Sequence, residues 1–218
     1  MIDCDELVRR VRVVINEATD DGDVSLLSVD TRSLDDTILE LLPQAVTFMQ
    51  KNKGNGVGCV NSKSAKLSTL NIVPTSGGGI MALPDDFEEL VSLKLEKWQT
   101  PVHVIHAHDS REVAWQQNEY TRAGYCRPVC IETFTPGGIR CLLLYPFAQG
   151  DSSNPESFLY EACFNKGDGL NCQNNAIADA VVYKCASLLY TVFERYDAAN
   201  SMLALALAAC GGQVGKRE

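Results

Sequence analysis

The spacing of apolar residues changes its period twice along this chain of 218 residues. Near the N-terminus apolar side chains recur every three or four residues, and this spacing returns from about residue 174 to residue 210. Between about residues 57 and 164, apolar and polar residues alternate instead, as they do from Val91 to Leu95. A period of three to four predicts an amphipathic helix, whereas a period of two predicts a half-buried strand. The chain is therefore predicted to place a strand-rich segment between helices.

Two helices are predicted before the strands. Asp3 can cap the first helix, and Glu6, three residues later, completes a capping box. The second helix is predicted to begin after Ser33 as its cap and to run toward Asn52. Pro43 lies inside this second pattern, where it is expected to kink or split the helix because it lacks an N–H and clashes with the preceding turn.

The middle of the chain contains short alternating runs typical of strands, separated by turn residues. Pro136-Gly137-Gly138 separates two of these runs, which predicts a hairpin. A short helix is expected to begin at Ser110. The glycine-rich Gly54–Gly58 is interpreted as a connector, because a dinucleotide fingerprint follows a strand and opens a helix. The predicted strands are 69–73, 91–95, 101–106, 128–134, 139–145 and 157–164.

The C-terminal part has neither proline nor glycine between Asn174 and Cys210, which predicts one long helix. At ~1.5 Å per residue an unbroken helix here would span ~55 Å, so a bend is expected near Asp197–Ser201. Its last part, Met202–Cys210, is apolar on every face and has to be covered all round, by the same chain or by a neighbouring subunit. Burial within the chain is the simpler arrangement, yet alanines between larger residues suit close contact between helices. The candidate subunit-interface residues are Met202, Leu203, Leu205 and Leu207.

Together these patterns predict an α+β fold, in which the N- and C-terminal helices form a bundle and a β-rich segment is inserted between them. The predicted domains are residues 1–56 with 173–212 as the helical bundle, and residues 57–172 as the β-rich segment with one short helix.

Composition narrows the classes of function. A net charge of −9 with scattered basic residues disfavours general affinity for nucleic acid, which requires clustered Lys and Arg. No apolar run approaches the ~18 residues of a membrane span, and the acidic N-terminus is unlike a signal peptide. No membrane partner is therefore expected.

The nine cysteines are an odd number without a Cys-x-x-Cys pair, which predicts reduced thiols. Four that lie in apolar runs are predicted to be core residues: Cys130, Cys141, Cys163 and Cys185.

The three histidines lie close together with an aspartate, as His103, His106, His108 and Asp109. Three protein ligands and a water would make a catalytic zinc site. In a strand, however, His106 and His108 share one face and His103 points to the other. A small metal-dependent enzyme using His106, His108 and Asp109 is therefore kept as an alternative, while polar residues at a strand end are the preferred interpretation. Cys126 or Cys130 could form a nucleophilic pair with His106, but apolar neighbours favour core packing for Cys130. No cofactor is predicted.

Several segments resemble parts of head–tail adaptor (connector, head-completion) proteins of tailed phages and prophages. The resemblance rests first on Leu83–Trp98, which reads L-P-D-D-F-E-E-L-V-S-L-K-L-E-K-W. It continues in Arg127–Glu132, in Leu143–Phe147 and in the C-terminal helix Ala180–Cys210. Subunits of this family pair a helical bundle with a β-containing segment and form a ring of about a dozen copies beneath the portal. The family has no catalytic residues to assign.

The resemblance implies a non-enzymatic structural subunit that bridges portal and tail. The expected partners are further copies of itself in a ring, the portal protein and a tail-completion protein. DNA is expected to pass through the ring without specific binding, because acidic residues facing the lumen would repel phosphate. The expected location is the host cytoplasm during assembly and then the virion neck. A generic intracellular protein-interaction module remains a third hypothesis.

Overall fold

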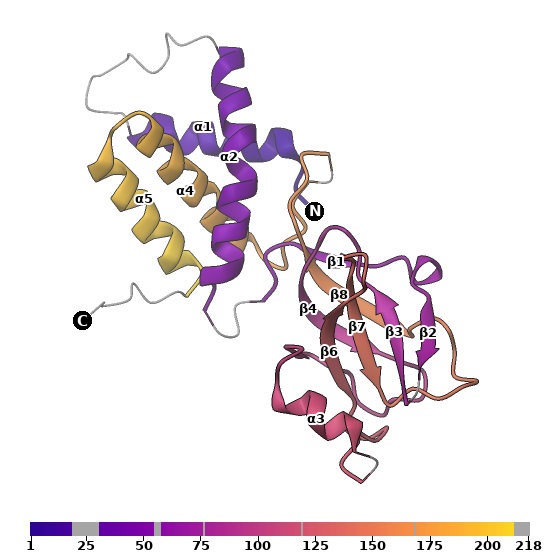
Figure 1. Cartoon of the computed structure of the whole chain (residues 1–218). Helices are drawn as coiled ribbons and strands as arrows, with labels where there is room; N and C mark the ends of the chain where they lie inside the picture. Colours follow the sequence, from indigo (N-terminus) through magenta and orange to yellow (C-terminus); the bar gives the residue numbers. More distant parts are fainter. Residues whose placement is uncertain (19–30, 55–57, 76, 119, 168, 212–218) are drawn as a thin grey trace. The chain divides into compact units, whose positions relative to one another are not determined.

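The computed structural model describes residues 1–18, 31–54, 58–75, 77–118, 120–167 and 169–211. The chain divides into two compact units, one formed by Met1–Ser62 with Cys163–Glu218 and the other by Lys63–Ala162. The predicted α+β class is confirmed, since helices from both ends of the chain flank a strand-rich middle (Figure 1). The strand-rich unit begins at residue 63 and ends at residue 162, compared with the predicted limits of 57 and 172.

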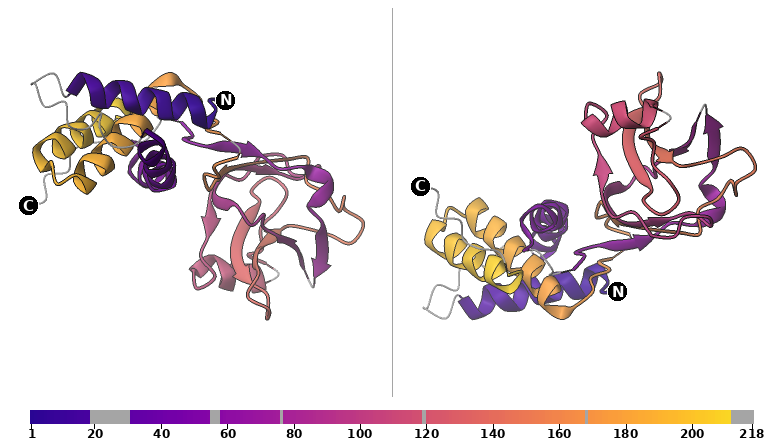
Figure 2. Two further views of the ribbon diagram at one scale, coloured as in Figure 1. Left: turned by 90° about the horizontal axis from the view of Figure 1, so that it is seen from above. Right: turned by 90° about the horizontal axis from the view of Figure 1, so that it is seen from below.

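The described part of the helical unit contains α1 (Cys4–Ala18), α2 (Thr31–Asn52), α4 (Asn175–Val192) and α5 (Tyr196–Ala209). Helix α4 is central to this unit, because α1, α2 and α5 all contact it. Figure 1 and the two views of Figure 2 show α5 beside α4, running in the opposite direction.

The start of α1 follows the predicted cap. The backbone N–H of Glu6 donates to Asp3 Oδ1 at 2.7 Å, which satisfies one of the free donors of the first turn. The Glu6 carboxylate accepts hydrogen bonds from Arg9 Nε at 2.7 Å and from Arg10 Nε at 2.8 Å. Glu6 is thereby held on the surface of α1, where its contacts are with the next turn of the helix.

Helix α2 starts at Thr31, two residues before the predicted cap Ser33, and runs continuously through Pro43. Of the two outcomes predicted for Pro43, a kink or a split, the split is therefore wrong. Both halves of the helix bury apolar side chains in the same core, with Ile38 and Leu42 on one side of the proline and Met49 on the other. This packing holds the helix together across the backbone donor that proline lacks.

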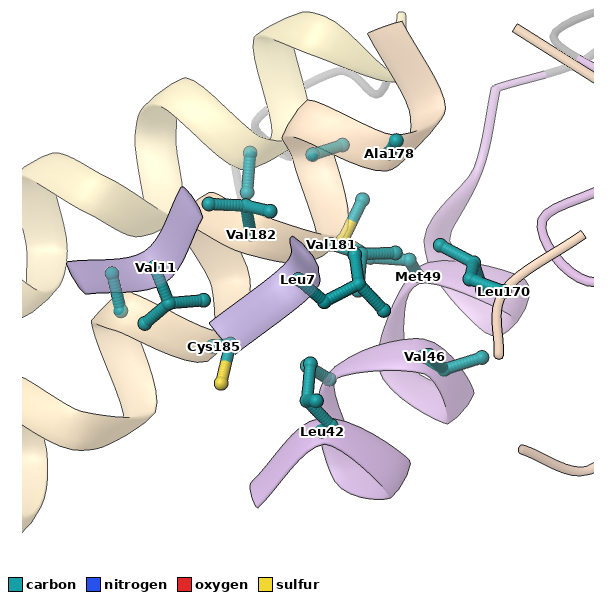
Figure 3. Close-up of a cluster of buried hydrophobic side chains, with 14 of the residues drawn as sticks. Leu7, Val11, Leu42, Val46, Met49, Leu170, Ala178, Val181, Val182 and Cys185 are labelled. Carbon is teal, nitrogen blue, oxygen red and sulfur yellow. The ribbon is translucent and has the colours of Figure 1, made fainter. Parts of the chain in front are cut away.

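The core of the helical unit is shown in Figure 3. It combines Leu7 and Val11 of α1 with Val46 of α2 and Val181 of α4, all completely buried. Leu170, which precedes α4, closes the same cluster, and Ile2 pairs with it through two backbone hydrogen bonds of 2.8 and 2.7 Å. The apolar helix faces predicted from the sequence thus pack together in one core.

The strand-rich unit contains two sheets that enclose a second core. The three-stranded sheet has the order β1-β8-β4, and the five-stranded sheet has the order β2-β3-β7-β6-β5. Apolar residues of both sheets meet in this core, among them Leu93 and Phe158 of the first sheet and Leu142 of the second. The strands are β1 (Ser62–Ser64), β2 (Ile72–Thr75), β3 (Gly78–Ala82), β4 (Phe87–Lys94), β5 (Ile105–His106), β6 (Val129–Phe134), β7 (Arg140–Tyr145) and β8 (Ser157–Ala162).

Some of the elements predicted for this unit are confirmed, and others have different bounds in the structure. The hairpin around Pro136–Gly138 is confirmed, since β6 and β7 pair antiparallel on either side of it. The short helix after Ser110 is confirmed as α3 (Arg111–Gln117). The strand predicted at 101–106 is reduced to β5, preceded by an isolated bridge between Leu93 and Val102. The strand predicted at 69–73 begins later, at β2, because a short 3₁₀ turn (Leu67–Thr69) occupies its start.

Strand β3 is not among the predicted strands, and it begins with two glycines. The structure gives a packing reason for them. A Cβ built on Gly79 would lie 2.6 Å from Ile72 Cγ2 and 2.8 Å from Phe147 Cγ. Glycine at this position therefore lets the backbone of β3 approach a neighbouring strand and an aromatic ring closely. Of the predicted connector Gly54–Gly58, residues 55–57 lie outside the described residues.

The prediction of a single C-terminal helix with a bend near Asp197–Ser201 is wrong. The chain forms two helices, and they are separated by Phe193, Glu194 and Arg195. Within the described ranges, none of the helices combines the length and apolarity required to cross a bilayer.

Candidate functional site

The turn between α4 and α5 decides which surface α5 presents. Glu194 adopts a left-handed conformation with φ of 61°. The N–H of Glu194 donates to the carbonyl of Thr191 at 3.1 Å, and the N–H of Arg195 donates to the carbonyl of Tyr190 at 2.9 Å. These two bonds form a Schellman motif, in which glycine usually occupies the left-handed position. The chain is thereby reversed, and α5 returns along α4.

The face of α5 that packs on α4 is built from small residues. Ala199, Ala206 and Cys210 are its buried apolar side chains, with exposed fractions of 5%, 0% and 0%. The Ser187 hydroxyl on α4 donates to the carbonyl of Ala199 at 2.8 Å, which fixes the two helices against each other. Small side chains at a helix contact allow the two backbones to approach closely.

The leucines of α5 are less buried than these small residues. We define the outer face of α5 as Leu203, Ala204, Leu205, Leu207 and Ala208. Leu205 is 48% exposed, the two alanines are exposed, and Leu203 and Leu207 are half-buried. At 3.6 residues per turn, the alanines lie in the middle of this face, with Leu203 and Leu207 along one edge and Leu205 along the other.

The four predicted interface residues are therefore divided between two surfaces. Met202 is half-buried and packs against the core of the helical unit. Leu203, Leu205 and Leu207 belong to the outer face. The sequence contains no charged residue between Asp197 and Cys210, so this face also lacks the charges that normally mark a solvated helix surface.

The apolar surface extends toward the turn. Val192, the last residue of α4, is 57% exposed, and Tyr196, the first residue of α5, is 61% exposed. Large apolar side chains exposed on neighbouring turns are typical of a contact surface for another molecule.

The predicted histidine cluster is spread over a strand and the turn that follows it. His106 is half-buried in β5, whereas His108 and Asp109 are exposed before α3. His103 is exposed, and its Nδ1 is hydrogen-bonded with the carbonyl oxygen of Val91 at 2.7 Å. Over the described ranges, His, Cys, Asp and Glu side chains do not gather in groups of three or more that could hold a metal ion.

The cysteines are free thiols, and most of those predicted as core residues are buried. Burial raises the pKa of the Cys185 thiol to about 12 and raises that of Cys130 further, so both favour the neutral form. Cys130 thus has the opposite environment to a reactive thiolate. Cys163 is exposed, which corrects its predicted place in the core: β8 ends at Ala162, immediately before it.

The outer face of α5 has the chemistry of a contact with another apolar surface. Its leucines carry no acidic, basic, nucleophilic or hydrogen-bonding group. Comparison of the chain with protein-family models finds no match, and a search of curated proteins finds none either.

Proposed function

We propose that this chain is a non-enzymatic structural subunit of a phage or prophage head–tail adaptor ring, and that the outer face of α5 contacts the neighbouring copy. The observation that carries the proposal is that α5 buries its small side chains more completely than its leucines. Small residues such as Ala199 and Ala206 are buried in the core, whereas Leu203 and Leu207 are half-buried and Leu205 is 48% exposed. A helix that served only its own core would bury its leucines, because each fully buried leucine contributes about 1.5–3 kcal/mol.

The outer face is also held rigidly enough to serve as an interface. Its helix is tied to α4 by the Schellman motif at Glu194 and by the bond from Ser187 to the Ala199 carbonyl. A surface that is ordered before binding loses less conformational entropy when a partner covers it. The geometry thus favours a permanent assembly contact over a surface that becomes ordered on binding.

The wider role follows from the resemblance in the sequence. A helical unit built from both ends of the chain, with a strand-rich unit between them, is the layout expected for an adaptor subunit. In this role the ring docks on the portal protein on one side and on a tail-completion protein on the other, first in the host cytoplasm and then in the virion neck. A net charge of −9 supports passage of DNA without specific binding.

The test is native mass spectrometry of the full chain at high concentration, with Leu205→Asp as the variant. The wild type is expected to assemble into a ring, and Leu205→Asp is expected to remain monomeric because it places a charge on the outer face. Ile139→Asp is the matched control, since Ile139 is 58% exposed but lies at the β6–β7 hairpin of the other unit. A wild type that stays monomeric would overturn the proposal. So would a Leu205→Asp variant that assembles as well as Ile139→Asp does.

A further inference from the structure

A ring of identical subunits requires two different surfaces on each subunit, because head-to-tail contacts join one patch to another patch on the next copy. The outer face of α5 supplies only one of the two. We propose that the groove between α1 and α4 is the second, and that it receives the outer face of α5 from a second copy of this chain. This inference rests on the proposed function and identifies the missing half of its interface.

The groove has a volume of about 340 Å³ and is lined by three valines, one tyrosine and four charged side chains of the two helices. Val13 and Val14 come from α1, and Val182 and Tyr183 come from α4. Val13 is 42% exposed, whereas Val182 is 2% exposed and forms the floor. The groove therefore offers apolar surface that solvent reaches and that a second apolar surface can cover.

The charges around the groove are already paired with one another. Glu6 binds Arg9 at 2.7 Å and Arg10 at 2.8 Å, and Arg10 reaches Asp179 across the two helices at 3.5 Å. Hydrogen bonds from Arg9 and then Arg10 lower the pKa of the Glu6 carboxyl to about 2, so this group is ionised at neutral pH. An acidic or basic partner would have to compete with these pairs, whereas an uncharged partner leaves them intact.

The outer face of α5 meets this requirement. It has no charge, and Leu203 and Leu207 are one helical turn apart along one edge. Residues spaced by four form a ridge that packs into the groove between other side chains. Ala204 and Ala208, next to this ridge, leave room for a side chain such as Val13 that projects from the groove. The uncharged outer face can thus cover the valines of the groove without disturbing its ion pairs.

A contact between two α5 helices is the competing arrangement, and it makes a different assembly. Such a contact uses the same patch on both copies, so it closes a two-fold dimer and leaves no free surface for growth. The α1–α4 groove would then have no part in the association. Substitutions on the two surfaces, examined singly and in mixture, separate the two arrangements.

The experiment uses Leu205→Asp to block the outer face and Val13→Asp to block the groove. Both residues are largely exposed, at 48% and 42%, so both variants are expected to fold, as far-ultraviolet circular dichroism would show. Each variant alone is expected to associate at least about tenfold more weakly than the wild type. An equimolar mixture is expected to form a one-to-one heterodimer and nothing larger, because it has one intact groove and one intact outer face. Ile139→Asp is again the control and is expected to assemble like the wild type.

The outcomes separate failure of this inference from failure of the proposed function. If the wild type assembles and Leu205→Asp does not, but Val13→Asp assembles normally, the groove is not the second surface and the ring proposal stands. A mixture of the two variants that stays monomeric also overturns the groove. If the wild type is monomeric under the same conditions, the ring itself is overturned, and the groove inference with it.

Discussion

Glu194 offers a direct test of how α5 is positioned, because this residue holds a backbone conformation that favours glycine. Its φ of 61° lies in the left-handed region. A side chain there costs about 1–2 kcal/mol through the contact of its Cβ with the following carbonyl. Glycine removes that contact but costs about 0.5–1 kcal/mol through the greater freedom of the unfolded chain. Glu194→Gly is therefore expected to raise the free energy of unfolding by about 0.5–1 kcal/mol, from the difference of these two terms.

The assay is urea unfolding followed by far-ultraviolet circular dichroism, which reports mainly the helical unit. For a chain of 218 residues the same gain corresponds to a rise in Tm of about 1–4 °C. Glu194→Ala is the control, since alanine removes the carboxylate but keeps the Cβ in the left-handed conformation. If Glu194→Gly is no more stable than Glu194→Ala, the strain argument is wrong and any gain comes from the charge. If it is less stable than the wild type, the Schellman turn itself is refuted.

Lys184 and Gly79 give two further predictions of stability. Lys184 is 8% exposed, and burial lowers the pKa of its side chain. The folded protein therefore disfavours the charged form. The free energy of unfolding is expected to rise with pH between the pKa in the folded protein and the pKa in the unfolded chain, near 10.5. Lys184→Met is expected to abolish that rise, which urea unfolding at several pH values would measure. An unchanged pH profile would refute this account. Gly79→Ala is expected to destabilise by about 1–3 kcal/mol, because its Cβ would press on Ile72 and Phe147. The matched control is Gly124→Ala, whose Cβ has no neighbour within 4 Å; equal unfolding midpoints for the two variants would contradict the packing argument.

The class of fold could be predicted because the period of apolar residues depends on local geometry, and both helical and strand periods are clear in this chain. Details that depend on tertiary packing could not be predicted from the sequence. Pro43 predicts a kink or a split, yet the helix is continuous, and apolar residues on both sides of the proline share one core. Glycine at position 79 is explained only by Ile72 and Phe147, which fill the space where its side chain would be. In both places the deciding contact comes from a distant part of the chain.

The same limit explains why the reversal before α5 was missed. Turns of this type are usually marked by glycine, and the segment from Asn174 to Cys210 has none. Glu194 occupies the glycine position instead, so composition carried no signal for the turn.

The candidate interface illustrates a further point about helices that are apolar on every face. The sequence shows that Met202–Cys210 has to be covered, but it does not show which side faces its own core. Once the turn returns α5 along α4, close approach of the two helices is possible only where side chains are small, and Ala199 and Ala206 occupy those positions. The leucines are left half-buried or exposed as a consequence, so the residues that permit the hairpin also give α5 its apolar outer face. A substitution that enlarges the inner residues is therefore a fold change, whereas one at Leu205 tests assembly alone.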